Sequence, residues 1–225
     1  MQPVKVISVN VGQPQDITLG KHHAVSGIDK RAVPERVRVG GLGLEGDHIM
    51  SRKHHGGPDQ AVYLYSLEDY GAFAEELGQM PAPGVFGENL TIQGLESASV
   101  RIGTRLSIGG QISGGKSSGE VLLEVTAPRI PCATFAAHMG DAGFVKVFRQ
   151  MRRPGLYARV LKTGLVGAGD TLTVQDGPEA APTVGEQFEL YYDPSPSREE
   201  LERSLAAPIA IRSRQDYLER LNRLA

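Results

Sequence analysis

The single cysteine of the chain has the most distinctive chemistry in the sequence. Cys132 ends the segment PRIPC (128–132), directly after the predicted strand EVLLEVTA (120–127). The thiol therefore lies where a strand ends, and the prolines restrict the direction of the backbone that presents it. A thiolate is a soft ligand for a redox-active metal, and Arg129 can favour the thiolate or bind a phosphate. A lone cysteine is also often a small buried apolar residue, so these residues alone leave both interpretations open.

A glycine-rich segment, HHGGPD (54–59), places an imidazole beside a carboxylate. Histidine ordinarily titrates near neutral pH, so His55 can act as an acid or a base, and Asp59 can orient it. A nucleophilic pair formed by Cys132 and His55 is a second possibility. From the spacing alone, a solvent-facing turn is the commoner explanation for such a segment.

Three further segments hold groups suited to a ligand. FGENLT (86–91) places the Asn89 amide at the start of a strand, where it can hydrogen-bond a ligand or shape a turn. SGIDKRAV (26–33) holds Lys30 and Arg31, which can bind a phosphate or be ordinary surface charges. GLGLEG (41–46) matches the GxGxxG of dinucleotide loops. Because the polar run after it leaves little room for the required helix, a tight turn with positive φ at glycine is favoured.

These side chains need strands to position them. Apolar or alternating runs predict strands at 4–9, 36–39, 61–66 and 89–94, and a closely spaced series follows up to residue 175. Ser66 is predicted to cap a helix that Gly78 ends, and 140–151 predicts another short helix. With 28 Gly and 14 Pro between the short strands, the pattern predicts a barrel or sandwich that is mainly β with some α. Residues 110–119 are expected to form a flexible hairpin tip.

After residue 176 the sequence pattern changes from short strands to helices. Three capping boxes follow, each before a stretch with helical spacing of apolar residues: Thr183 with Glu186, Ser197 with Glu200, and Ser213 with Asp216. We therefore divide the chain into a barrel domain, residues 1–176, and a three-helix appendage, residues 183–225. The appendage is interpreted as a packing or dimerisation module without chemistry of its own, which makes a homodimer possible.

Composition excludes several classes of function. The formal net charge is −2 and the basic residues are scattered, so neither nucleic acid nor an anionic membrane is expected as a partner. No apolar run approaches the ~18 residues of a membrane span, and the N-terminus lacks the pattern of an export signal, so we expect a cytoplasmic protein. One cysteine cannot form an internal disulfide, a cluster of iron and sulfur, or a paired-cysteine zinc site.

Six segments, taken in order, resemble the MOSC domain family. They are SGIDKRAV (26–33), GLGLEGD (41–47), HGGPDQAVYLYS (55–66), FGENLTIQGL (86–95), EVTAPRIPC (124–132) and RRPGLYARVLKTGLVGAGD (152–170). HGGPD and the trailing helices are similar to the YiiM-like branch, which has a C-terminal three-α domain. The resemblance implies a mixed β-barrel, and a molybdenum cofactor whose metal is bound by the pterin dithiolene and by Cys132.

The resemblance also implies an activity, the reduction of N-hydroxylated compounds of the hydroxylaminopurine or amidoxime type. In this interpretation His55, aided by Asp59, supplies a proton. Lys30, Arg31 and Arg129 bind the anionic tail of the molybdopterin, and Asn89 hydrogen-bonds the pterin. No flavin or cluster motif is present, so electrons must come from a separate reductase.

Two other functions are compatible with the same resemblance. A module without turnover could carry sulfur as a persulfide on Cys132, and pyridoxal phosphate binding is attached to the family by association. The sequence departs from the family pattern at Ala32, where many relatives have proline, which weakens the assignment of a phosphate to Lys30 and Arg31. Residues 110–119 resemble an insertion.

Overall fold

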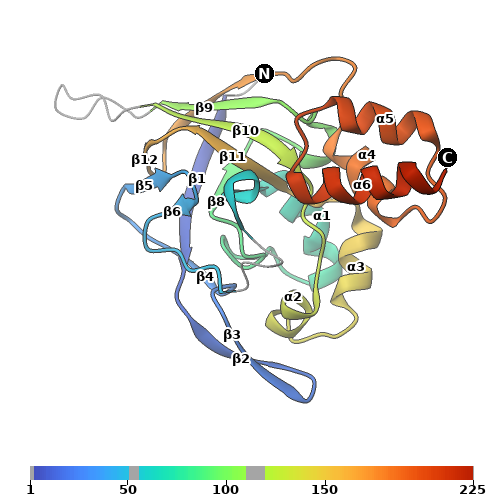
Figure 1. Cartoon of the computed structure of the whole chain (residues 1–225). Coiled ribbons are helices and arrows are strands. Elements are labelled where there is room, and N and C mark those ends of the chain that lie inside the picture. Colours follow the sequence, from blue (N-terminus) through green and yellow to red (C-terminus); the bar gives the residue numbers. More distant parts are fainter. Residues whose placement is uncertain (1–2, 51–55, 110–119, 225) are drawn as a thin grey trace.

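Seven strands close into a barrel at the centre of the molecule (Figure 1). The computed structural model describes residues 3–50, 56–109 and 120–224. Around the barrel the strands follow the order β13-β9-β10-β11-β7-β8-β1, and β1 then pairs with β13 to close it. Their bounds are β1 (Val4–Gly12), β7 (Val62–Ser66), β8 (Leu90–Gln93), β9 (Arg105–Gly109), β10 (Val121–Ala127), β11 (Leu156–Lys162) and β13 (Thr171–Gln175). The barrel is mixed, because β7 and β8 are parallel while the other neighbours are antiparallel.

The burial pattern of each strand follows from what covers it. In β1, Val4 and Val6 are buried while Lys5 between them is exposed, as expected when one face of a strand meets the barrel interior and the other meets water. In β7 all five residues are buried, because helices and an aromatic cluster cover the outside of this strand. The apolar runs at 4–9 and 61–66 therefore predict the positions of both strands correctly.

The aromatic cluster fills the space between the barrel and the helices beside it. Its members are Tyr63, Tyr65, Tyr70, Phe73, Phe86, Phe135, Phe144, Phe148 and Phe188. It is surrounded by β7, α1 (Leu67–Leu77), α2 (Ala133–His138), α3 (Phe144–Met151) and α4 (Val184–Tyr192). Ser66 caps α1 by accepting the Asp69 N–H, and Gly78 ends that helix in the left-handed conformation, as the sequence predicts. The helix predicted at 140–151 begins later, at Phe144.

Smaller elements extend from one side and one end of the barrel. β5 (Val37–Gly40), β6 (Gly43–Leu44) and β12 (Gly164–Val166) form a separate sheet, and β4 (Lys30–Ala32) pairs with the end of β1. The GxGxxG segment is the tight turn of the β5–β6 pair, with φ of 130° at Gly43. β2 (Gln15–Leu19) and β3 (His22–Ser26) form a hairpin that projects from the lower end of the molecule in Figure 1. Two 3-10 turns, η1 (Pro58–Gln60) and η2 (Ser97–Ser99), complete the set.

The C-terminal residues form α4, α5 (Arg198–Ala206) and α6 (Ile211–Arg223). The capping boxes predicted at Thr183 and Ser197 are both present. The third prediction is wrong, because α6 begins at Ile211 and Ser213 lies inside it. The reason is that a carboxylate from another element does the capping: the Ile211 N–H donates to Asp59 Oδ2 at 2.9 Å.

These elements confirm the predicted fold class, a mixed β-barrel with C-terminal helices, although helices and strands contribute about equally to it. The first and last parts of the chain share one hydrophobic core, since Val184, Leu201 and Ile209 belong to the same buried cluster as the barrel residues. Within the described ranges, none of the helices combines the length and apolar character that crossing a bilayer requires.

Candidate functional site

A cavity of about 490 Å³ lies beside the β2–β3 hairpin, at the end of the barrel where the loop before α2 begins. Its lining includes the thiol of Cys132, two cationic side chains, Lys30 and Arg129, and the amide of Asn89. The hairpin contributes an apolar wall through Ile17, Leu19, Ala24 and Val25. The cavity therefore joins a polar, cationic end to an apolar end, which is the usual character of a small-molecule or cofactor site.

Cys132 lies at the junction between a strand end and a helix. It is the residue before α2 and has extended dihedral angles, φ −136° and ψ 173°. Its side chain is half-buried and lines the cavity. Pro128 and Pro131 precede it in a segment without ladder pairing, so the loop leaves β10 and carries the thiol away from the sheet. A partly exposed thiol in a cavity is suited to metal binding or to chemistry, as a sealed packing residue is not.

Arg129 forms part of the cavity wall and is buried, with 5% of its surface exposed. Its guanidinium donates to the carbonyl of Phe86 and lies over the ring of Phe135, 4.0 Å from the centroid. Burial lowers the pKa of Arg129, but Tyr63, Tyr157 and the Cys132 thiol outweigh that effect, so the pKa is raised overall. The guanidinium therefore stays charged beside the thiol, where it favours thiolate character.

Two tyrosines complete this end of the cavity. Burial raises the pKa of Tyr63 well above its usual value and also raises the pKa of Tyr157, with Arg129 opposing the shift in each case. Tyr63 donates its hydroxyl proton to the Pro154 carbonyl at 2.9 Å. Both residues line the cavity as neutral phenols that keep their protons at any ordinary pH.

The Asp47 carboxylate, which does not line the cavity, binds both Lys30 and Asn89. Asp47 accepts from the Lys30 ammonium through both of its oxygens and from Asn89 Nδ2 at 2.9 Å. Asp47 also accepts the Gly12 N–H at 2.8 Å. The Lys30 and Asp47 side chains are 7% and 3% exposed, so this is a buried ion pair. Burial lowers the pKa of Lys30, and the Asp47 carboxylate opposes that shift.

Close backbone contacts make this arrangement possible. A Cβ at Gly12 would lie 1.9 Å from the Gly27 carbonyl oxygen, and a Cβ at Gly27 would lie 2.0 Å from that of His48. Neither glycine can be replaced without moving the backbone, because the neighbouring atoms belong to the main chain. The end of β1, the segment before β4 and the segment after β6 therefore meet here, which brings Lys30 and Asp47 together.

Glu88 lies one residue before Asn89 and is fully buried. Its Oε1 accepts from the Tyr70 hydroxyl, the Thr91 hydroxyl and the Gly84 N–H at 2.7, 2.7 and 2.6 Å. Burial raises the pKa of Glu88, and these donors oppose the shift. The carboxyl group orders the backbone that presents Asn89 to the cavity, and it is not itself part of the lining.

The other predicted site residues occupy different places. The Arg31 side chain is 78% exposed, pairs with Asp29 at 2.8 Å, and does not line the cavity. The Asp59 carboxylate accepts the Ile211 N–H and pairs with Arg159 at 3.1 Å, so it faces α6. His55 lies outside the described residues, as does the predicted hairpin tip at 110–119. The structure thus brings Cys132, Lys30, Asn89 and Arg129 together at one cavity.

Sequence reasoning missed three residues of this site: Asp47, Tyr63 and Tyr157. Asp47 ends the segment GLGLEGD and follows a glycine turn, which was a usable signal. Its buried role depends on a lysine 17 positions earlier in the chain, and no local pattern shows that contact. The tyrosines stand in apolar strand patterns, where they are indistinguishable from core residues.

The donor set suits a cofactor that combines a soft metal with an anionic organic part. A thiol is the ligand that such a metal prefers. Arg129 supplies positive charge, Lys30 supplies an ammonium that is paired with Asp47, and Asn89 supplies an amide oxygen that also accepts the Tyr63 N–H. Gly27, Gly56 and Gly87 also line the cavity, so the backbone can approach a flat ligand closely. The residues present therefore fit a molybdenum cofactor.

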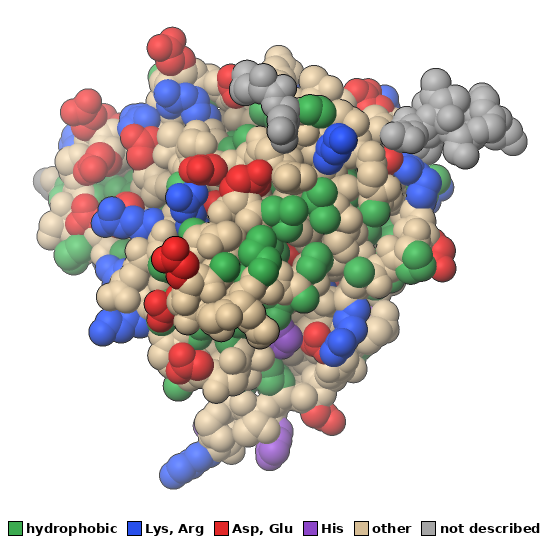
Figure 2. Space-filling view, turned by 180° about the vertical axis from the view of Figure 1, so that it is seen from behind, with side chains coloured by type: hydrophobic (Ala, Val, Ile, Leu, Met, Phe, Trp, Pro, Cys, Tyr) green, Lys and Arg blue, Asp and Glu red, His purple; other side chains and the backbone are tan. Residues whose placement is uncertain are grey.

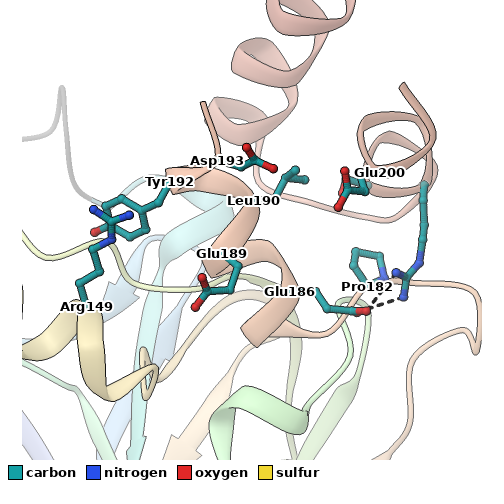
Figure 3. A pocket seen from close by; sticks show the side chains of 10 residues that line it. Arg149, Pro182, Glu186, Glu189, Leu190, Tyr192, Asp193 and Glu200 are labelled. Atoms are coloured by element: carbon teal, nitrogen blue, oxygen red, sulfur yellow. Dashed lines mark hydrogen bonds and ion pairs between the residues drawn. The ribbon is translucent and has the colours of Figure 1, made fainter. Parts of the chain in front are cut away.

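A second hollow, of about 460 Å³, lies between α3, α4 and α5 (Figure 3). Its carboxylates already have structural roles, since Glu186 and Glu200 close the capping boxes and Arg203 bonds Glu186 at 3.0 Å. Arg149 lies over the ring of Tyr192, 4.1 Å from the centroid. The lining contains no thiol and no glycine, so the cavity at Cys132 is the candidate site.

Comparison with known proteins agrees with the fold and the cavity. Residues 51–173 match the model of the MOSC domain. The chain belongs to the MOSC domain family, whose members are linked in general to binding of the molybdenum cofactor.

Particular relatives extend this result. The chain is 30% identical to the uncharacterized protein YflK of Bacillus subtilis over 97% of this chain and 95% of that protein. It is 32% identical to protein YiiM of Escherichia coli over 69% of this chain and 68% of that protein. A protein of Gibberella moniliformis named "Reductase" is 30% identical over 79% of this chain, which is 30% of its own length.

A solved structure shows the same architecture. The crystal structure of YiiM from Geobacillus stearothermophilus superposes with a TM-score of 0.76 and 26% identity, covering 97% of this chain and 100% of that one. The predicted YiiM-like branch is therefore confirmed.

Proposed function

We propose that this chain is a molybdenum-cofactor oxidoreductase that reduces N-hydroxylated compounds with electrons from a separate reductase. The observation that carries the proposal is the arrangement of the cavity. Cys132 and its neighbour Arg129 line the same cavity as Lys30 and Asn89, which come from two other parts of the chain. Packing alone does not require a thiol and two cations to face one hollow.

The residues of the cavity would divide the binding of the cofactor between them. Cys132 would ligate the metal, the guanidinium of Arg129 would keep that sulfur in its thiolate form, and Lys30 and Asn89 would hold the anionic and hydrogen-bonding parts of the pterin. When bound, the cofactor supplies the two electrons that break the N–O bond. With two protons, the hydroxylamine group becomes an amine and water.

The chain's own residues also control protons and water. Tyr157 remains protonated, so its hydroxyl can donate a hydrogen bond without becoming charged, whereas Tyr63 already donates its proton to the Pro154 carbonyl. The apolar wall of the hairpin excludes water from one side of the cavity. His55 stays our predicted proton donor, with Asp59 as its predicted orienting partner, and Arg31 our predicted phosphate ligand.

The test replaces the thiol and measures metal as well as turnover. We expect Cys132→Ala and Cys132→Ser, purified from a host that makes the cofactor, to lose molybdenum or to lose reduction of 6-hydroxylaminopurine by at least about a hundredfold, the scale on which a transition-metal site responds to loss of a ligand or its partner. Thr18→Ala, on the exposed face of β2 and outside the lining, is the control that should leave both unchanged. Wild-type protein that contains no molybdenum, or a Cys132→Ala variant as active as wild type, would contradict the proposal.

A sulfur carrier is the second candidate, because the Cys132 thiol is half-buried and reachable from the cavity beside a cation. It predicts a labile extra sulfur on Cys132, seen by mass spectrometry of the intact protein and removed by a reductant. The family-associated alternative, pyridoxal phosphate, would need a lysine. Lys30 lines the cavity, but its ammonium is bound to Asp47, and borohydride treatment would show whether it forms a Schiff base.

A further inference from the structure

We propose that the C-terminal helix α6 belongs to the candidate site, with Arg212 as a positioning residue that holds one wall of the cavity. That wall is the segment Gly56–Gln60, which contains η1. The inference rests on the proposed function for the identity of the ligand, and on contacts alone for the positioning. It differs from the interpretation of the C-terminal helices as a packing or dimerisation module.

The contacts of Arg212 carry the proposal. Its Nη1 donates to the Gly56 carbonyl at 3.1 Å and to Gln60 Oε1 at 2.6 Å. Gly56 and Gln60 both line the cavity, whereas Arg212 itself does not. One guanidinium from α6 therefore bonds both ends of the segment from behind, and these charge-assisted bonds are stronger than those between neutral groups.

A second set of bonds fixes α6 against the same segment. The Asp59 carboxylate accepts the Ile211 N–H at the start of the helix and also pairs with Arg159. Arg159 in turn donates to the carbonyls of Pro208 and Ile209 at 3.2 and 3.3 Å. Asp59 and Arg159 thus connect the start of α6 to the cavity segment, so the two are coupled mechanically.

The segment Gly56–Gln60 needs these hydrogen bonds because it begins with two glycines, whose backbones have more accessible conformations than those of other residues. Gly56 and Gly57 have φ of 68° and 91°, values that other residues rarely adopt. Gly56 is also close to Ile49, another lining residue, since a Cβ there would lie 2.8 Å from Ile49 Cδ1. The charge of Arg212 also acts on a lining residue, Tyr157. Burial raises the pKa of Tyr157, and the positive charge of Arg212 partly opposes that rise.

The experiment compares two arginines of α6 by hydrogen–deuterium exchange on the full-length protein without substrate. Arg212→Ala should speed exchange of the amides at 56–60 by about tenfold or more, as expected when local opening becomes easier. Arg214→Ala is the matched control, because Arg214 donates to the Leu205 and Ala207 carbonyls and stays within the C-terminal helices. It should destabilise the protein comparably and leave exchange at 56–60 as in wild type.

A third variant keeps the test valid if Arg212→Ala folds poorly. Gln60→Ala removes the acceptor from the cavity side, leaves α6 intact, and should raise exchange in the same segment. Equal exchange at 56–60 in wild type and Arg212→Ala, or equal acceleration by Arg212→Ala and Arg214→Ala, would overturn the inference. Because exchange is measured without turnover, this result is independent of whether N-hydroxylated compounds are the substrates.

For the holoprotein, the expected consequence is a faster loss of molybdenum during dialysis from Arg212→Ala than from Arg214→Ala. If exchange changes as expected but no preparation ever contains molybdenum, the positioning role stands and the proposed function fails. If molybdenum is bound and exchange is unchanged, the positioning role fails, while the cofactor binding that the proposed function requires stands.

Discussion

Asp47 is the residue on which the polar end of the cavity depends. Its two oxygens bind the Lys30 ammonium, the Asn89 amide and the Gly12 N–H. Lys30 and Asn89 face the cavity, so one carboxylate behind the wall sets the direction of both. A carboxylate in this position also neutralises the lysine, which lowers the net positive charge that an anionic ligand meets.

Replacing Asp47 by Asn should therefore destabilise the fold. Breaking a buried ion pair leaves an uncompensated charge and costs about 3 to 5 kcal/mol, which urea denaturation would measure. The double variant Lys30→Met with Asp47→Asn should recover a large part of the loss, because it removes both charges. A single variant within about 0.5 kcal/mol of wild type, the usual range of a surface change, would show that the pair is unimportant.

The same variant should have a characteristic dependence on pH. Burial already lowers the pKa of Lys30 below the 10.5 of an exposed lysine, and loss of the carboxylate lowers it further. Between this lowered pKa and 10.5, the unfolded chain binds more protons than the folded one, so stability rises with pH. Asp47→Asn should thus approach wild-type stability as the pH increases towards 10, and diverge from it as the pH falls.

For single residues, the sequence shows which side chains could bind a ligand or a metal. It does not show which of these side chains lie together in the folded protein. Cys132 and Arg129 could be selected because they follow a predicted strand beside prolines, Asn89 because it begins one, and Lys30 as a basic residue able to bind a phosphate. Arg31 was selected on the same grounds, yet its side chain is mostly exposed, because neighbouring residues on a short strand point to opposite sides. The glycine turn before Asp47 is visible in the sequence, but its pairing with Lys30 is not, since burial and pairing are properties of the folded chain.

The β2–β3 hairpin is the element that most directly shapes the apolar end of the cavity. It projects from the barrel, and β2 packs against α2, the helix that begins after Cys132. In Figure 2, which shows the opposite face, the lower end of the molecule carries His and Lys side chains at its tip. On β2, Ile17 and Leu19 line the cavity, while Thr18 between them points to the other face.

This alternation gives a matched pair of variants for substrate recognition. Leu19→Glu should raise KM for an aromatic amidoxime such as benzamidoxime by about tenfold or more, the scale of one lost apolar contact in a pocket. Thr18→Glu adds the same charge one residue away and should leave KM unchanged. Equal KM values for the two variants would mean that the hairpin does not contact the substrate.

Elements that contain their own start and stop signals were predictable, and elements that depend on others were not. The helix after Ser66 and the helices after Thr183 and Ser197 have their caps within the local sequence. The start of α6 was misplaced because its cap, Asp59, lies 152 positions earlier in the chain. The short helix α2 escaped prediction because six residues carry too little periodicity.

At the scale of the whole molecule, the larger of the two hydrophobic clusters bears on the predicted division into residues 1–176 and 183–225. Leu190, Leu201 and Tyr217 from the C-terminal helices belong to the cluster that fills the barrel. Backbone bonds also join the two parts, since the Val184 N–H donates to the Val100 carbonyl at 2.7 Å and the Ala210 N–H to that of Thr126 at 3.1 Å. The predicted division follows a change in sequence pattern, but one hydrophobic cluster contains residues from both parts.

We therefore expect a single cooperative unfolding transition. Circular dichroism of the backbone and near-ultraviolet signals of the tyrosines should give the same urea midpoint, because both parts share one core. A chain shortened to residues 1–176 should expose the apolar surface that the C-terminal helices cover and should aggregate or bind a hydrophobic dye. Two separate midpoints, or a shortened chain as stable as the whole, would show independent domains.

The pairing of β1 with β13 has a consequence for how the protein is made. Val4 and Lys5 are synthesised well before their partners, Leu172 and Thr171. The barrel therefore stays open at this seam until β13 has been synthesised, and its interior is accessible during that time. Any prosthetic group that needs the finished cavity must consequently enter after this pairing has formed.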